Sequence, residues 1–131
     1  MTLDEAISGL YRALCFDAGD TPDWRLLDEV LAPNARLVRV NEEGVFEFDP
    51  RTFRRDLEEK MARGELASFY ESEVSRQVQE FNDIAHVLSI YEARVSRDAE
   101  VLFRAVKSMQ LFQRDGRWSI SALLWRRGVA F

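Results

Sequence analysis

The sequence predicts an α+β domain in which two helices, a short hairpin and a third helix are followed by a long antiparallel meander. Apolar residues recur at helical spacing in the first half of the chain, whereas long strand-like runs separated by short turns fill it from Ser68 onward. Helices gathered on one side of an antiparallel sheet define this class. The chain has 131 residues, 47% of them hydrophobic and 31% charged, so we expect residues 1–131 to form a single domain.

Capping residues indicate where the three helices begin. Thr2 and Glu5 match a capping box at the start of the first helix. The second and third helices each begin with an N-cap residue followed by proline, at Thr21-Pro22 and Asp49-Pro50. The expected helical ranges are 2–16, 21–33 and 49–64.

Six strands are expected, in a short hairpin and a longer meander. The hairpin consists of 36–40 and 45–48, and the meander of 68–80, 84–96, 100–113 and 117–127. Asp115-Gly116 is the best turn signal, because a two-residue hairpin turn needs residues that tolerate positive φ.

Tight hairpins would fix which residues face each other. With Asp115-Gly116 as the turn, Ser108 is expected opposite Leu123, and Val106 opposite Trp125. This pairing mixes hydroxyl and amide groups with large apolar side chains on one face, which is typical of a small-molecule pocket. The alternative is that this face is the outer or dimer-facing side. The predicted pocket residues of the sheet are Tyr91, Arg104, Ser108, Gln110, Ser121, Leu123 and Trp125.

Large apolar side chains occur on both faces of the predicted sheet, including Leu88, Ile90 and Leu124 on the second face. Three helices can cover only one face. We therefore expect a homodimer through the outer face of the sheet. The alternative is a monomer whose long strands curl around a single interior.

Composition excludes several classes of protein. One cysteine, Cys15, and one histidine, His86, leave no disulfide within the chain, no Cys/His zinc site and no iron–sulfur cluster. We expect no metal site and no cofactor. A net charge of −5, with both signs dispersed, argues against nucleic-acid and membrane partners. The N-terminus has no signal-peptide pattern, and no apolar run is long enough to span a bilayer, so a cytoplasmic location is expected.

Several segments carry a family resemblance: 81–92, 108–112 and 115–120, with Ala18-Gly19-Asp20 and Leu31-Ala32-Pro33-Asn34-Ala35. Together they resemble the nuclear transport factor 2-like superfamily, which includes the ketosteroid isomerases and the SnoaL-like polyketide cyclases. The small SnoaL-like members are most similar. The resemblance implies a strongly curved sheet of about six strands wrapped around the helices as a cystatin-like cone, usually dimeric, with a pocket at the open end.

The isomerase mechanism can be tested against the sequence. In the isomerases a tyrosine and two aspartates carry out enolisation. Alignment on Ala18-Gly19-Asp20 places the tyrosine position at Arg12 and the aspartate positions at Arg39 and Ser108. Because an arginine stays charged at neutral pH, it cannot abstract a proton, and the mechanism is expected to be absent.

The pocket itself is expected to survive, because Trp125 matches the aromatic wall position of the family. Tyr11, one residue from the tyrosine position, is a further pocket candidate. Arg12 and Arg39 would suit a carboxylate or phosphate if they point inward. The alternative is that both are surface arginines.

Other candidates have structural interpretations beside the functional ones. His86 is expected to point away from the pocket face, as a structural or interface residue. Tyr91 and Arg104 are expected opposite each other, as a ligand-orienting or a sheet-stabilising pair. Among the acidic residues, Glu92 is the first candidate for a position near a cavity. Cys15 is expected to be an inert buried thiol.

Three functions remain open. The first is a domain that binds a small, mostly apolar molecule. The second is an isomerase, dehydratase or cyclase that uses Tyr91, Glu92 or His86. The third is a protein-interaction module whose cavity is filled by Phe112 and Trp125.

Overall fold

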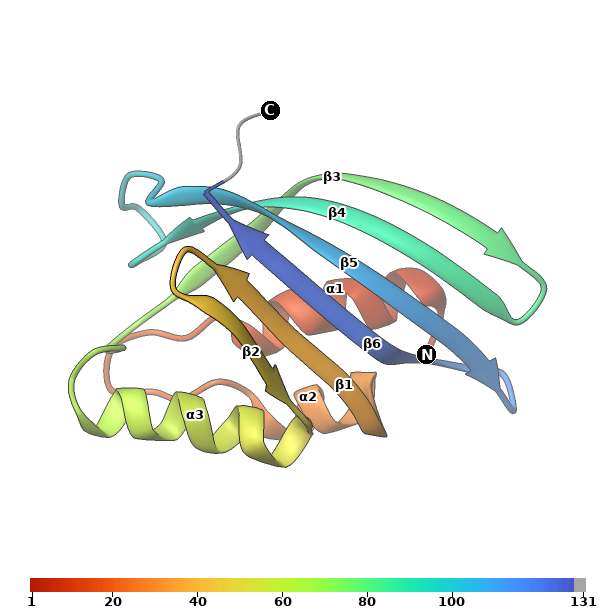
Figure 1. Cartoon of the computed structure of the whole chain (residues 1–131), viewed down its shortest axis with the longest axis horizontal. Helices are drawn as coiled ribbons and strands as arrows, with labels where there is room; N and C mark the ends of the chain where they lie inside the picture. The colour runs from red at the N-terminus through yellow and green to blue at the C-terminus, as the bar shows by residue number, and fades with distance from the viewer. Residues whose placement is uncertain (129–131) are drawn as a thin grey trace.

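The computed structural model describes residues 1–128, so the last three residues of the expected 1–131 domain lie outside the described residues. Three helices and six strands follow one another in the order shown in Figure 1. The α+β class is confirmed. The elements are α1 (Leu3–Leu14), α2 (Trp24–Val30), β1 (Leu31–Asn41), β2 (Gly44–Phe48), α3 (Pro50–Ala62), β3 (Tyr70–Phe81), β4 (Ile84–Arg94), β5 (Phe103–Arg114) and β6 (Arg117–Arg127).

One curved sheet holds all six strands, in the order β2-β1-β6-β5-β4-β3. Its neighbours pair antiparallel except for β1 and β6, which run parallel in the middle of the sheet. Figure 1 shows the sheet bending over the helices, with α3 beside the β1–β2 hairpin. The predicted six-stranded sheet around three helices is therefore confirmed.

The ends of α1 and α3 follow the predicted capping chemistry. Thr2 and Glu5 form a reciprocal capping box, and so do Asp49 and Thr52, with Pro50 in the first turn of α3. The backbone amides at both helix starts thus find hydrogen-bond acceptors.

Our boundaries for the second helix were wrong. Its N-cap is Asp23, whose carboxylate accepts the amide hydrogen of Leu26 at 3.0 Å, and the helix ends at Val30 instead of reaching Pro33. Pro33 lies in β1, where pairing with β6 is interrupted between Leu31 and Arg36. A proline is tolerated there because no partner strand needs its missing amide hydrogen.

The core lies between the helices and the concave face of the sheet. Alternate residues of β4 and β5 are buried, as expected for a sheet with one covered face. Large side chains at its centre are Ile7, Leu10, Leu37, Val87, Tyr91, Met109 and Ile120.

Our pairing of β5 with β6 was wrong beyond the middle of the hairpin. Asp115-Gly116 forms the predicted turn, and pairs close to it, such as Leu111 with Ile120, have the expected register. A register shift follows, so Ser108 lies opposite Leu124 instead of Leu123. The bulge adds one residue to β6 and reverses which of its side chains face the core.

The pairing of β4 with β5 also differs from our prediction. Tyr91 lies opposite Ala105, and Arg104 lies opposite Glu92. The connection spans residues 95–102 and is not a tight turn, so turn geometry could not fix this register.

Candidate functional site

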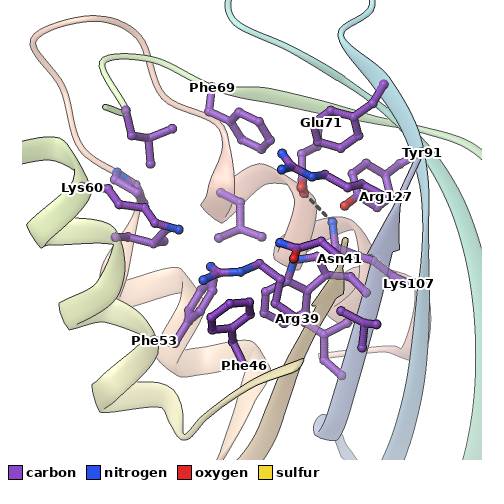
Figure 2. A pocket seen from close by; sticks show the side chains of 18 of the residues that line it. Arg39, Asn41, Phe46, Phe53, Lys60, Phe69, Glu71, Tyr91, Lys107 and Arg127 are labelled. Carbon is purple, nitrogen blue, oxygen red and sulfur yellow. Dashed lines mark hydrogen bonds and ion pairs between the residues drawn. The ribbon is translucent and has the colours of Figure 1, made fainter. Parts of the chain in front are cut away.

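A cavity of about 460 Å³ lies between α3, the β1–β2 hairpin and the ends of the long strands. Figure 2 shows α3 forming one wall and the strands forming the other. Most of the lining is apolar or aromatic. Principal lining residues are Leu14, Phe16, Arg39, Asn41, Phe46, Phe53, Leu57, Lys60, Leu66, Phe69, Glu71, Tyr91, Phe103, Lys107, Leu123, Trp125 and Arg127.

Two charged side chains meet at the buried end of the cavity. The Nζ of Lys107, on β5, donates to Oε1 of Glu71, on β3. Their side chains are only 2% and 7% exposed. Lys107 also lies 3.9 Å from the ring centroid of Tyr91 and 4.1 Å from that of Tyr11. Carboxylate and ring faces therefore compensate a charge removed from water.

Burial governs the ionisation of this cluster. Loss of solvation lowers the pKa of Lys107, while the charge of Glu71 and its hydrogen bond oppose the shift. Burial raises the pKa values of Tyr11 and Tyr91 well above the ordinary range. Both phenols therefore stay protonated at neutral pH.

A hydrogen-bond network behind the cavity holds Tyr11 in place. Its hydroxyl lies 2.6 Å from Oγ of Ser89, which in turn donates to Glu73. Arg76 then joins Glu73, at 2.7 Å, to Asp4 on α1. This network fixes α1 against β3 and β4, and with them the ring that covers Lys107.

Tyr91 differs from Tyr11 in having a hydroxyl that faces the cavity. No hydrogen bond joins this hydroxyl to any residue in the range 1–128. Every fully buried side-chain nitrogen and oxygen in that range has a partner. Because Tyr91 is 1% exposed and lines the cavity, its hydroxyl is reached only from there.

Aromatic rings and a second ion-pair cluster form the mouth. Arg39 and Lys60 both pair with Asp56, at 3.1 and 3.2 Å. The guanidinium of Arg39 lies 4.9 Å from the ring centroid of Phe46. Phe53 on α3 packs edge-on against Trp125, with 5.6 Å between the ring centroids.

The structure brings together only some of the predicted pocket residues. Tyr91, Leu123 and Trp125 line the cavity. Tyr11 lies behind Lys107 and does not line it. The remaining four, Arg104, Ser108, Gln110 and Ser121, lie outside the cavity.

The register shifts explain why those four residues lie elsewhere. Arg104, Ser108 and Gln110 alternate with the buried Ala105, Lys107 and Met109, so they occupy the outer face. Ser121 lies at the bulge, where its hydroxyl donates to the carbonyl of Gln110 at 3.1 Å.

Other predicted residues also have structural partners outside the cavity. His86 lies opposite Gln110 on the outer face and is hydrogen-bonded to it. Glu92 pairs with Arg104 at 2.9 Å, so the expected pairing of Tyr91 with Arg104 was wrong. Cys15 exchanges hydrogen bonds with the backbone of Glu71, and burial raises the pKa of its thiol.

Sequence reasoning identified neither Lys107 nor Glu71 as a site residue. Lys107 is one of only two lysines in the chain. With the correct register it falls on the inward face of β5, where a lone lysine indicates a buried ion pair. Glu71 becomes recognisable only after Lys107 is placed.

Within residues 1–128, no three His, Cys, Asp or Glu side chains are grouped as metal ligands would be. In the same range, every helix is too short or too polar to cross a bilayer.

No protein-family model matches the chain, and no curated protein matches it. Solved structures do match. A protein of unknown function with a cystatin-like fold from Nostoc punctiforme is 14% identical and has a TM-score of 0.74, with 98% of this chain and 90% of that chain covered. A protein of unknown function from Silicibacter pomeroyi, described as NTF-2 like, is 17% identical with a TM-score of 0.63, covering 96% and 92%.

The chain has the nuclear transport factor 2-like fold. The cystatin-like cone expected from the sequence is thus confirmed. A third structure with the nuclear transport factor 2-like fold is the hexachlorocyclohexane dehydrochlorinase LinA-type3 from Novosphingobium barchaimii. It is 14% identical with a TM-score of 0.71, covering 97% of this chain and 84% of that one. At such identities the likeness establishes the fold, and function must be argued from the site.

The three positions aligned with the isomerase catalytic residues lie in different parts of the molecule. Arg12 is exposed on α1, Arg39 lines the cavity mouth, and Ser108 lies on the outer face. The two arginines do not converge, so they do not form a joint anion site.

Proposed function

We propose that this protein binds a small, largely apolar molecule in the cavity between α3 and the sheet. The observation that carries the proposal is the cavity itself. It has a volume of about 460 Å³ and aromatic walls, and it ends at the Tyr91 hydroxyl and the Lys107–Glu71 pair. Small-molecule sites combine such a volume with a few converging polar groups. The dehydrochlorinase of the same fold is named for its action on a small chlorinated hydrocarbon.

A protein-interaction module with a filled cavity receives less support. Phe112, one of the two side chains expected to fill the cavity, does not line it. Trp125 packs against Phe53 in one wall and leaves the interior open. The open volume favours a ligand over an internal plug.

Thermal unfolding with a panel of small acids, sterols, polyphenols and polyketide-like aromatics tests the proposal. A ligand present at 100 times its dissociation constant stabilises the native state by about 2.7 kcal/mol, so the melting temperature rises by several degrees. Trp125→Ala should remove the shift because it opens the wall of the cavity.

Trp24→Ala is the matched control, because Trp24 packs partly buried against the core without lining the cavity. It should melt earlier yet keep the ligand-induced shift. A ligand that stabilises both variants equally would place its site elsewhere and contradict the proposal.

A proton-transfer enzyme is the second candidate, favoured by the buried Glu71–Lys107 pair. A carboxylate that is buried and lines a cavity, as Glu71 is, can exchange a proton with a bound substrate. Such an isomerase, dehydratase or cyclase would use Glu71 instead of Glu92 or His86, which lie outside the cavity. Glu71→Gln should then abolish turnover of a ligand found by the panel while the ligand still binds. Unchanged turnover would reject this candidate.

We propose further that two copies associate through the outer face of the sheet. Leu88, Ile90 and Val106 are half-buried there, and Leu124 is 44% exposed. The helices cover only the concave face, as Figure 1 shows. A two-fold axis would bring the same apolar surface of both copies together.

A further inference from the structure

Two hydrogen-bonding atoms remain unused at the buried end of the cavity. The hydroxyl of Tyr91 is one of them. The other is the second carboxylate oxygen of Glu71, because Lys107 donates to the first. Neither atom has a hydrogen-bond partner within residues 1–128, yet every fully buried side-chain nitrogen and oxygen in that range has one. Both atoms therefore contact the cavity that their residues line.

These two atoms offer opposite kinds of hydrogen bond. A carboxylate oxygen only accepts, whereas a protonated phenol donates. Burial raises the pKa of Tyr91, so its proton remains available for donation. A ligand group must consequently donate to Glu71 and accept from Tyr91 if it is to satisfy both.

Lys107 and Glu71 balance each other's charge at this end of the cavity, and Arg127 adds a further cation to the lining (Figure 2). Lys107 is paired with Glu71, and its ammonium lies against the rings of Tyr11 and Tyr91. At the unused Glu71 oxygen, an incoming carboxylate would be repelled by the Glu71 carboxylate, and it has no hydrogen to donate to that oxygen. An incoming ammonium would compete with Lys107 for the same carboxylate.

We propose that the cavity selects an uncharged ring compound with a hydroxyl group, whose hydroxyl donates to Glu71 and accepts from Tyr91. This assignment rests on the proposed ligand-binding function and names the chemical class of the ligand. The aromatic walls hold the ring, since Phe53, Phe69 and Trp125 line the same cavity. A simple ketone would satisfy Tyr91 alone, because it has no hydrogen to donate to Glu71.

Three probes with one skeleton isolate the polar end of the ligand. They are indane, an indanol with its hydroxyl on the aromatic ring, and the corresponding indane carboxylate. Isothermal titration calorimetry at neutral pH should show indanol binding about tenfold more tightly than indane, because a hydrogen bond to a charged group contributes at least that factor. The carboxylate should bind more weakly than indanol, by about tenfold or more.

Two tyrosine variants provide a matched comparison. Tyr91→Phe should weaken indanol binding about fivefold and leave indane binding unchanged. Tyr11→Phe should leave the affinity for indanol unchanged, although it breaks the hydrogen bond to Ser89 and lowers the melting temperature. Tyr91→Phe breaks no internal hydrogen bond, so the variant should retain its fold.

The outcomes separate this assignment from the proposed function. Indane carboxylate binding as tightly as indanol would overturn the assignment while the ligand-binding function stands. Equal affinity of indane and indanol would also overturn the assignment alone. An unchanged indanol affinity in Tyr91→Phe would have the same meaning. Failure of all three probes to bind would contradict the assignment together with the binding function in this cavity.

Discussion

Lys107 is buried in the core, whereas lysine side chains are normally exposed to water. Its side chain is 2% exposed, and its ammonium depends on Glu71 for charge compensation. We expect Lys107→Met to lower the free energy of unfolding by about 3 kcal/mol or more, because Glu71 would stay buried without its charge partner. Urea denaturation at neutral pH measures this loss.

Lys60→Met is the matched control, since Lys60 is the other lysine and pairs with Asp56 at the more exposed cavity mouth. It should cost less than about 1 kcal/mol. Adding Glu71→Leu to Lys107→Met should recover most of the loss, because an apolar pair can replace a buried ion pair. Equal losses for the two lysine variants would contradict a compensated buried charge.

The buried phenols make stability fall with pH in the alkaline range. The ordinary pKa of tyrosine is 10.0, and burial raises the values of Tyr11 and Tyr91 in the folded chain. Above that pH the unfolded chain loses phenolic protons that the native chain keeps. Each tyrosine should therefore lower stability by up to about 1.4 kcal/mol per pH unit.

Lys107 has the opposite effect, because its pKa in the folded chain is lowered from 10.5. Stability should rise with pH until the unfolded lysine titrates, so the tyrosine effect is clearest above that pH. Urea unfolding over the alkaline range should show a shallower decline for the Tyr11→Phe/Tyr91→Phe double variant. The same slope as in the unmodified protein would contradict this explanation.

At the scale of elements, α1 and α2 meet at a glycine. A Cβ on Gly9 would lie 2.9 Å from Cγ1 of Val30, closer than side chains normally approach. Alanine favours a helix by about 1 kcal/mol over glycine, whereas overpacking costs roughly 1–3 kcal/mol. We therefore expect Gly9→Ala to destabilise the fold, as measured by chemical denaturation.

The sign of this effect should reverse when Val30 is shortened. In a Val30→Ala background the added Cβ has space, so only the helix preference of alanine remains, and Gly9→Ala should stabilise. Destabilisation by a similar amount in both backgrounds would exclude the α1–α2 contact as its cause.

Element positions could be predicted from the sequence much better than strand registers. Capping residues located α1 and α3, and Asp115-Gly116 located the last turn, because these signals act between near neighbours in the chain. The bulge between Gln110 and Leu111 has no such local signal. It depends on how two long strands follow a curved surface. Because the prediction lacked the bulge, it placed the pocket on the wrong face of β5.

The site was less predictable than the fold for the same reason. Trp125 and Leu123 were placed in the pocket on a wrong pairing, and they line the cavity because the bulge restores their inward orientation. Glu71 and Lys107 are 36 residues apart in the chain, and no spacing rule connects them. Only the assembled sheet shows that they meet.

At the scale of the whole molecule, the proposed homodimer predicts a molar mass in solution of twice that of one chain. Light scattering should find two copies per particle in solution. Leu124→Glu should yield folded monomers, because it places a charge on the apolar outer face. Leu102→Glu is the control: it changes a side chain that is 56% exposed in the 95–102 connection. It should leave the dimer intact, and a monomeric unmodified protein would refute the interface.

The parallel pairing of β1 with β6 has a consequence for how the chain is made. Leu37 lies beside Leu123, so the middle of the sheet joins an early strand to the last one. During synthesis, β1 and β2 emerge from the ribosome long before β6 exists, and α1 and α2 lack part of the surface that covers them. Such distant pairing slows folding and leaves apolar surface exposed for longer. The nascent chain must therefore wait for its final strand before its core can close.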